Sequence, residues 1–417
     1  MRATVVNLLF FTLSMCYGQG NLPLQVPTPP PSLHIGLTER IGNFSVELLY
    51  HTAKLQEMKQ NLVISPITVW TVLAVIAEGA SEGTARQINH AIRIKTRSRE
   101  AVRHDFNEMA KWLQVKTKAV QLAKINAIFV NIDSLPRADF SQLAKSYYDT
   151  DVVPLNFNDS VTSANSINNA IANVTHGRIS KIVDSSYFQN TQMILTSAVY
   201  FKGEWTFPFN TTSTFKMPFY SSAGVKTGEV NMMYNRQNYP FANVQELQAR
   251  VIEIPYGTYN RLSMLIMLPH PDVSLETMFY NFQKVTLDKV FEELRISKEE
   301  FGDDEVDCLI PRFKIETNLD LTDILKKYFY IQDLFDESRA RLPRMADWPV
   351  YVSKIVHKAE IEVTEEGTTA SGVTVAEFSN RIGVIRFEAN RPFTYVIIEK
   401  ATNSIVFGGV YQQPSLF

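Results

Sequence analysis

The chain has 417 residues, of which 45% are hydrophobic and 20% are charged, so it can bury a large core and is longer than one ordinary domain. Its formal net charge of -2 gives no reason to expect nucleic-acid or membrane attachment through whole-molecule electrostatics. No interior linker divides the hydrophobic pattern and no repeat restarts it, so we expect one large domain.

The first 18 residues have the pattern of a secretory signal peptide. Arg2 precedes an apolar run at 5–15, and Cys16 and Gly18 are small residues that suit cleavage. The run is too short to cross a bilayer comfortably, and the alternative interpretation is a buried N-terminal helix. We therefore predict a signal peptide at 1–18, a proline-rich flexible arm at 19–35 and a domain at 36–417 of a secreted, extracellular protein.

Cysteine and sequon positions agree with secretion. Once the signal is removed, Cys308 is the one cysteine left, so no internal disulfide is expected. It lies in a strand-like run at 306–311, which favours a buried, inert thiol over a reactive one. In a secreted chain, each Asn-x-Ser/Thr sequon is a plausible glycan site. The sequons are at Asn43, Asn158, Asn173 and Asn210.

The first half of the domain has mainly helical periodicity. We predict a buried strand at 122–132 and helices at 36–58, 66–78, 99–114, 138–148 and 162–174. Ser65 and Pro66 fit the cap and first-turn positions of the second helix. The third helix is amphipathic, and its inward face carries Phe106, Met109 and Leu113.

The second half is predicted to be rich in strands. They are expected at 194–205, 251–254, 262–268, 306–315, 385–387, 392–399 and 404–410. Trp205 ends the first of these, and we interpret it as structural. Helices followed by many strands fit one α+β domain.

One short motif suggests a hydrolase. Gly79-Ala-Ser81-Glu-Gly83 matches the Gly-x-Ser-x-Gly nucleophile elbow, for which His357 would be the base. The elbow needs a strand before it, whereas residues 67–78 have helical spacing, so the hydrolase interpretation is disfavoured. There is no Cys-x-x-Cys, His-Glu-x-x-His or phosphate-loop signature, and the seven histidines are dispersed. We expect no catalytic residue, no cofactor and no metal site.

The pattern changes within 359–393. Ile361 and Val363 alternate with glutamates, as in a half-buried strand. After Gly367, residues two apart share an uncharged and mostly small face in an extended chain. That face consists of Thr368, Ala370, Gly372, Thr374, Ala376 and Phe378. It would make a poor permanent strand and an unusually uncharged loop, so we interpret it as a segment that is a loop in one state and a strand in another.

These residues resemble the reactive-loop region of the serpins, protease inhibitors whose loop inserts into a β-sheet after cleavage. The resemblance is carried by 361–370, Arg391-Pro-Phe393, Phe407-Gly-Gly-Val410 with Pro414, and Asn61–Pro66, and it spans about 36–414. It implies the serpin fold, with a large central mixed β-sheet that can accept the reactive loop, about 365–388, as an extra strand. Eight or nine helices and two smaller sheets would complete that fold.

The resemblance also implies where the loop is attacked. In the family the cleaved bond lies about fourteen or fifteen residues beyond the hinge glycine, which from Gly367 places it at Arg381-Ile382. Arg386 and Arg391 are rivals, but the first lies too far along and the second belongs to the flanking strand motif. The hinge would consist of Glu365, Glu366, Gly367, Thr368, Thr369, Ala370, Ser371 and Gly372.

A second implied region is the place where the sheet opens. By itself, a lone histidine such as His357 is more often a satisfied core group than a catalyst. The family gives it hydrogen bonds to small polar partners, here Ser65, Thr68 and Ser197, with Trp205 near the insertion point. Ser197 stands where the family usually has asparagine. A serine is shorter and loses one donor–acceptor pair, so the strength of the hydrogen bonds at the opening region stays open.

An arginine at the reactive bond suits trypsin-like serine proteases, which hold it with a carboxylate. Arg381-Ile-Gly-Val384 also resembles the activation site of trypsin-like zymogens. We expect a monomeric suicide-substrate inhibitor that forms a covalent complex with a protease of an extracellular cascade. The alternative is a non-inhibitory serpin that acts as a carrier or binding protein.

A polyanion is a further candidate partner, because basic residues gather in the region where some serpins bind heparin-like chains. The other interpretation of these residues is a solvated helix face. They are Lys95, Arg97, Arg99, Arg103, Lys111, Lys116 and Lys118.

Overall fold

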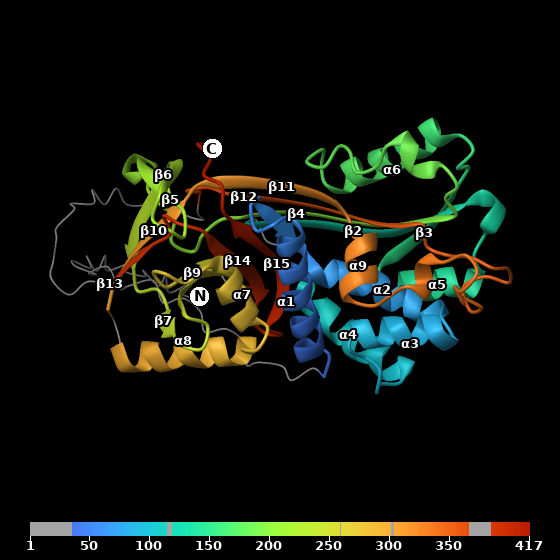
Figure 1. The fold of residues 1–417 in the computed structure, drawn as a ribbon, viewed down its shortest axis with the longest axis horizontal. Helices are drawn as coiled ribbons and strands as arrows, with labels where there is room; N and C mark the ends of the chain where they lie inside the picture. Colours follow the sequence, from blue (N-terminus) through green and yellow to red (C-terminus); the bar gives the residue numbers. More distant parts are fainter. Residues whose placement is uncertain (1–35, 115–118, 259, 302–303, 367–384) are drawn as a thin grey trace, which may run out of the picture.

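The computed structural model describes residues 36–114, 119–258, 260–301, 304–366 and 385–417, which form helices and three β-sheets (Figure 1). The predicted signal peptide and proline-rich arm lie outside these residues. The described α-helices are α1 (Thr38–Leu55), α2 (Pro66–Gly79), α3 (Glu82–Ala91), α4 (Arg99–Leu113), α5 (Ala138–Tyr148), α6 (Ser160–Val174), α7 (Leu275–Phe282), α8 (Leu287–Phe301) and α9 (Thr322–Tyr328).

A five-stranded sheet has the order β11-β12-β4-β2-β3. Its strands are β11 (Phe313–Asp320), β12 (Lys354–Val363), β4 (Met193–Gly203), β2 (Val120–Asn131) and β3 (Thr150–Leu155). The β12–β4 and β2–β3 pairs are parallel, whereas β11–β12 and β2–β4 are antiparallel. This is the mixed sheet expected from the sequence.

The two other sheets have six and four strands. The six-stranded sheet consists of β1 (Leu62–Ile64), β15 (Ser404–Tyr411), β14 (Phe393–Glu399), β9 (Leu262–Pro269), β8 (Ala249–Tyr256) and β7 (Phe241–Val244) in that order. The four-stranded sheet consists of β13 (Ile385–Glu388), β10 (Val306–Pro311), β6 (Lys226–Gln237) and β5 (Phe215–Tyr220).

The helices predicted from periodicity are found, with small shifts of their ends. In α4, the three predicted inward residues Phe106, Met109 and Leu113 are buried. Ser65 occupies the N-cap position of α2, but its hydroxyl does not cap the helix. It donates instead to the main-chain oxygen of Val406 at 2.7 Å, so the predicted capping contact is wrong.

The predicted strand at 306–315 is wrong, because the structure has two strands there. β10 pairs with β6 and β13 in one sheet, and β11 pairs with β12 in another. The chain changes sheets at Arg312, whose main-chain N–H donates to the main-chain oxygen of Asn231 at 2.8 Å. The strand-like pattern is present on both sides of Pro311 and Arg312, and such a pattern does not reveal which strand each half pairs with.

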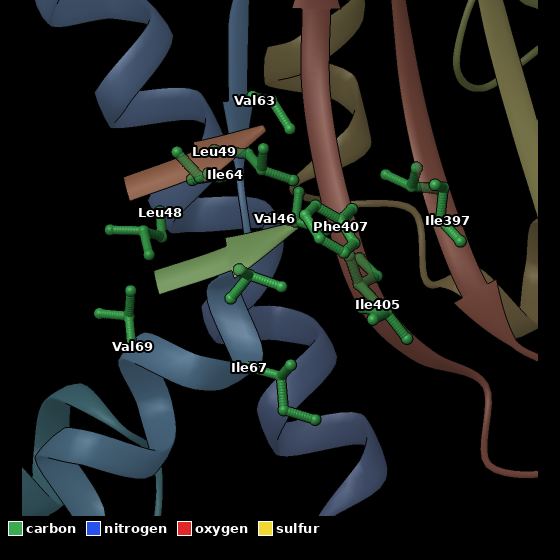
Figure 2. Close-up of a cluster of buried hydrophobic side chains, with 14 of the residues drawn as sticks. Val46, Leu48, Leu49, Val63, Ile64, Ile67, Val69, Ile397, Ile405 and Phe407 are labelled. Atoms are coloured by element: carbon green, nitrogen blue, oxygen red, sulfur yellow. The ribbon is translucent and has the colours of Figure 1, made fainter. Parts of the chain in front are cut away.

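The main hydrophobic core lies where α1, β1 and α2 pack on β14 and β15 (Figure 2). Its side chains include Leu49 of α1, Ile64 of β1 and Phe407 of β15, all fully buried. Gly409 is required in this packing, since a Cβ there would overlap the main-chain oxygen of Leu62 and the side chain of Tyr395. The Gly-Gly pair near the C-terminus therefore allows β15 to approach β1 closely.

A second core lies between the five-stranded sheet and α6, which covers the face of the sheet opposite α2 and α5 (Figure 1). Ile167 and Ile171 of α6 are fully buried there. The segment after α6 is tied to the sheet, since Lys358 Nζ donates to the main-chain oxygen of Lys181 at 2.7 Å. The sheet is thus covered on both faces, and its strand β4 is buried along most of its length, whereas buried and exposed residues alternate along most of β11.

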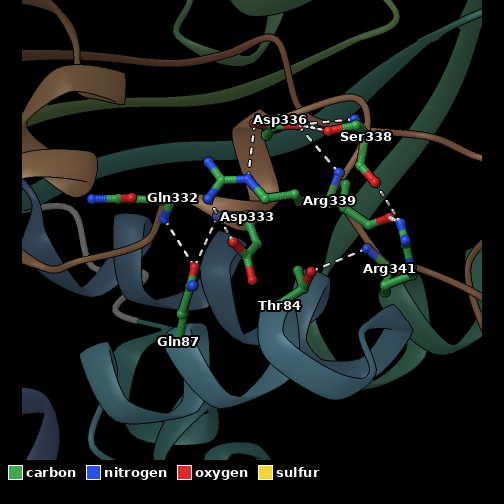
Figure 3. Close-up of polar contacts among 9 residues, drawn as sticks. Thr84, Gln87, Gln332, Asp333, Asp336, Ser338, Arg339 and Arg341 are labelled. Atoms are coloured by element: carbon green, nitrogen blue, oxygen red, sulfur yellow. Dashed lines mark hydrogen bonds and ion pairs between the residues drawn. The ribbon is translucent and has the colours of Figure 1, made fainter.

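The Gly79–Gly83 motif lies between two helices, so it lacks the strand that a nucleophile elbow needs. Polar contacts join α3 to the segment that leads toward β12 (Figure 3). Gln87 Oε1 accepts from the main-chain N–H groups of Gln332 and Asp333, and Thr84 Oγ1 accepts from that of Arg341. Because the Gly79–Gly83 motif has no strand before it, the hydrolase interpretation has no structural support.

Within the described part of the chain, no helix is both long enough and apolar enough to cross a membrane.

Candidate functional site

The candidate site is the end of β12, from which the chain enters the segment 367–384. β12 lies parallel to β4 and pairs with it from Lys354 opposite Ile194 to Glu362 opposite Lys202. A strand that returned between β12 and β4 would run antiparallel to both. The two strands are paired with each other along this length, so the segment that follows β12 can enter only where they separate, and we call this line between β12 and β4 the slot.

The first residues of the hinge are held on the body by Trp205 and its neighbour Phe209. Trp205 Nε1 donates to the main-chain oxygen of Thr364 at 2.7 Å, and its main-chain N–H donates to that of Glu366 at 3.1 Å. The Phe209 N–H donates to the main-chain oxygen of Glu365 at 3.1 Å. The indole is fully buried and stacks on Tyr256 with ring centres 4.2 Å apart.

The Glu365 side chain is buried, with 4% of the residue exposed, and it has two partners. Its Oε1 accepts from the Thr214 hydroxyl at 2.7 Å, and its Oε2 lies 3.5 Å from Nη1 of Arg312. Glu366 is exposed, and its carboxylate lies 2.8 Å from Lys202 Nζ. A buried carboxylate requires such partners, because it would otherwise be strongly destabilised.

Of the five residues predicted for the opening region, all but Trp205 form a closed ring of hydrogen bonds. The Ser65 N–H donates to His357 Nε2 at 3.0 Å, and His357 Nδ1 lies 3.1 Å from Ser197 Oγ. Ser197 Oγ donates to Thr68 Oγ1 at 2.6 Å, and Thr68 donates to the main-chain oxygen of Ser65 at 2.8 Å. Since a main-chain N–H can only donate, the imidazole proton is on Nδ1.

The serine at 197 reaches both of its neighbours despite its length. It accepts from His357 of β12 and donates to Thr68 of α2, and its own residue lies directly opposite His357 in the β12–β4 register. The hydroxyl therefore joins the two strands beside the slot and connects them to α2. The donor–acceptor pair that an asparagine would add is absent, but the ring is complete.

We expect Ser197→Ala to destabilise the protein by about 1–3 kcal/mol, because it leaves the buried Nδ1–H of His357 without an acceptor. The comparison is the free energy of unfolding from urea titration of both proteins. Thr71→Val is the matched control, since Thr71 lies one turn along α2 and its hydroxyl only supplements a main-chain contact at Ile67. A loss no larger than that of the control would contradict the proposed role of the hydroxyl.

The His357 ring is fully buried, and this desolvation lowers its pKa from 6.5 to about 3, only partly opposed by its contact with Ser197. The unfolded chain takes up this proton below pH 6.5, whereas the folded protein does not until about pH 3. Stability is therefore lost as the pH falls through this window, by up to about 1.4 kcal/mol per pH unit from this group.

We expect His357→Gln to have a flatter pH dependence of stability between pH 7 and pH 4, because glutamine can hydrogen-bond to both neighbours without titrating. The measurement is the urea unfolding free energy at four or five pH values. Identical slopes for the two proteins would show that His357 does not titrate on unfolding in this range.

Part of the predicted loop lies outside the described residues. This holds for Gly367, Thr368, Thr369, Ala370, Ser371 and Gly372 of the hinge and for Arg381 and Ile382 of the reactive bond. The rival arginines are described. Arg386 is in β13 and pairs with Glu388 at 2.7 Å, and Arg391 donates to the main-chain oxygen of Pro269 at 2.7 Å.

The sequon asparagines lie at or near the surface. Asn158 lies before the start of α6 and Asn173 lies in its last turn, and both are exposed. Asn43 in α1 and Asn210 before β5 are partly exposed. Asn210 Oδ1 accepts from Thr212, which leaves its amide nitrogen outside that contact.

The basic residues around α4 are largely engaged with carboxylates. Arg97 pairs with Asp105, Lys111 with Glu108, and both Arg99 and Arg103 with the buried Glu78. Lys95 is exposed, and Lys116 and Lys118 lie outside the described residues. The helix therefore offers less free positive charge than its composition indicates.

Two further predicted features can be compared with the structure. Cys308 is a free, fully buried thiol, and burial raises its pKa well above the usual value, so it is inert as expected. Among the described residues, no three His, Cys, Asp or Glu side chains are grouped so that they could hold a metal ion.

Sequence reasoning missed the partners that hold the hinge. Thr214, Lys202 and Arg312 lie 151, 164 and 53 residues before their partner glutamates and carry no local motif. The burial of Glu365 is the signal that could have indicated such partners, because a buried carboxylate needs them. That burial cannot be read from the sequence.

The fold and site define a protein in which the strand that leads into the predicted hinge pairs in parallel with a central strand of a mixed, five-stranded sheet. The chain matches the family model "Serpin (serine protease inhibitor)" over residues 39–414. This match covers most of the chain. The chain belongs to the serpin family.

Individual relatives agree. Serpin B8 of Bos taurus is 30% identical over 387 residues, covering 91% of this chain and 99% of the relative. Leukocyte elastase inhibitor A of Mus musculus is 30% identical over 375 residues, covering 88% of this chain and 96% of the relative. The solved structure of native protease nexin-1 with heparin has a TM-score of 0.79 at 26% identity, covering 91% of this chain and 100% of that chain.

Proposed function

We propose that this serpin is a secreted suicide-substrate inhibitor of trypsin-like serine proteases, cleaved after Arg381. The observation that carries the proposal is the parallel pairing of β12 with β4, because the segment that follows β12 would run antiparallel to both strands if it entered between them. The family match and the inhibitors among the relatives support protease inhibition as such. The arginine supports the trypsin-like specificity, because such proteases recognise a cationic side chain through a carboxylate.

In this mechanism the serine of the protease attacks the carbonyl carbon of Arg381. An ester bond to the enzyme forms, the peptide bond breaks, and the amine of Ile382 leaves with a proton. The hinge is then free on one side. Residues from Thr368 onward enter the slot while still joined to the protease, which is carried with them and deformed before water can cleave the ester.

Insertion is favoured by the strand geometry. It exchanges one parallel pairing between β12 and β4 for two antiparallel pairings, which are somewhat more stable per residue. Each inserted residue adds on the order of 1 kcal/mol of net hydrogen bonding, together with apolar burial. The uncharged, small face of 368–378 suits a covered sheet, because a charge there would be buried without a partner.

The direct test is to mix the protein with trypsin. The proposal predicts a complex that survives denaturing electrophoresis and a released fragment whose N-terminus is Ile382. Complete cleavage with no covalent complex would exclude inhibition and favour the carrier alternative. A fragment beginning elsewhere would keep inhibition but move the reactive bond.

Secretion rests on the N-terminal pattern and on the four sequons. We expect the protein made in a secreting eukaryotic cell to begin near residue 19 and to lose mass on enzymatic removal of N-glycans. Asn158 and Asn173 are the sequon asparagines that are exposed, whereas Asn43 and Asn210 are partly exposed. Mass spectrometry of the secreted material tests this, and an unprocessed N-terminus without glycans would contradict it.

Polyanion binding stays a prediction beside this function. The protease nexin-1 structure, which contains heparin, supports it. The ion pairs of Arg97, Arg99, Arg103 and Lys111 oppose it, because a polyanion would have to compete with existing carboxylates.

A further inference from the structure

The end of the chain packs against the residue at which the strands change sheets. Arg312 Nε donates to the main-chain oxygen of Phe417 at 2.6 Å, and Asn231 Nδ2 donates to the same oxygen at 3.0 Å. The Arg312 guanidinium also lies over the Phe417 ring, 5.4 Å from its centre. Figure 1 shows this end of the chain beside β6 and β12.

Arg312 is also the cation that faces the buried hinge residue Glu365. Its Nη1 lies 3.5 Å from Oε2 of Glu365, so one guanidinium stands between Phe417 and the first hinge residue. The Arg312 side chain is 36% exposed, whereas that of Glu365 is 5% exposed. The buried carboxylate therefore depends on a cation that solvent can reach.

An exposed arginine normally contributes little to an ion pair, because holding its long side chain in one geometry costs conformational entropy and water screens the charge. Here the guanidinium contacts the oxygen and the ring of Phe417 through atoms other than the Nη1 that faces Glu365, and these contacts restrict its geometry. Most of the conformational entropy of the Arg312 side chain is thus lost before it contacts Glu365. The Arg312–Glu365 ion pair is then closer to a charge-assisted contact of fixed geometry.

We propose that Phe417 is a positioning residue for the hinge, which acts through Arg312 to keep Glu365 on the body of the molecule. In the intact protein it keeps residues Thr364–Glu366 bound to the body of the molecule, and it sets how readily they detach from it. The consequence for loop insertion rests on the proposed inhibitory function. The contact itself does not, and it can be measured in the free protein.

Two main-chain N–H groups report the attachment directly, because those of Trp205 and Phe209 donate to Glu366 and Glu365. We expect deletion of Phe417 to speed hydrogen exchange at these two amides by about threefold to tenfold, as for the loss of a partly screened charge contact. Phe417→Ala keeps the main-chain oxygen and removes the ring, so its effect should be smaller. Leu416→Ala is the matched control, since Leu416 is exposed.

A double-mutant cycle separates this role from a general structural one. In a Glu365→Gln background, deletion of Phe417 should have no further effect on the two amides, because the charge it positions has no anionic partner left. Exchange in the buried strand β9 should be unchanged throughout.

Three results would overturn the proposal: no change at Trp205 and Phe209, an equal effect in the Glu365→Gln background, or a uniform increase that includes β9. No protease enters this experiment. Failure of the trypsin test would leave the positioning role intact, and failure of the exchange test would leave inhibition intact.

Discussion

Thr368→Arg is expected to convert the protein from an inhibitor of trypsin into a substrate of trypsin. Thr368 belongs to the uncharged face of the segment that would enter the sheet, so the variant must bury an arginine without a carboxylate partner. That cost of several kcal/mol slows insertion, and the ester to the protease is hydrolysed first. The measurement is the number of inhibitor molecules consumed per protease molecule inactivated.

The neighbouring residue supplies the control. Thr369 lies on the opposite face of an extended chain, because side chains alternate along a strand. Thr369→Arg should therefore retain far more covalent complex than Thr368→Arg. Equal complex formation by wild type and both variants would show that insertion of this segment is not the inhibitory step.

Arg381→Ala is expected to lower the rate of trypsin inhibition by at least about a thousandfold. The specificity pocket of a trypsin-like protease is built around a carboxylate, and a site built for a charged partner strongly rejects a ligand that lacks it. The measurement is the second-order rate constant of inactivation. The fold should be unaffected, which thermal unfolding of the variant would verify.

Arg386→Ala is the matched control for that variant. Arg386 is the rival arginine closest to the predicted bond, and in the structure it belongs to β13 and pairs with Glu388. Its replacement should leave the inhibition rate within a few-fold of wild type. A large loss with Arg386→Ala and none with Arg381→Ala would assign the reactive bond to the rival position.

The helices were predictable where one apolar stripe persists over several turns. The residues 99–114 illustrate this, because Phe106, Met109 and Leu113 mark one face and Ser98 caps the helix at the expected end. The ring around His357 was predictable only through the family resemblance. Its members come from α2, β4 and β12, and no local pattern connects them.

Other features depend on tertiary partners that a single sequence does not reveal. The run 306–315 was predicted as one strand because its pattern is strand-like on both sides of Arg312, yet the chain changes sheets at that residue. The contacts that hold Glu365 and Glu366 were missed for the same reason. Lys202 lies in β4 and Thr214 lies just before β5, so only the folded chain brings them to these glutamates.

The central claim is that the segment beyond Gly367 inserts into the sheet once it is cut. The most direct measurement is the midpoint of thermal unfolding of the intact protein and of the protein cleaved once after Arg381, with both fragments retained. Insertion of the eleven residues 368–378 adds about 10 kcal/mol of pairing, so we expect a rise on the order of 10–20 °C. An unchanged or lower midpoint after cleavage would contradict the claim.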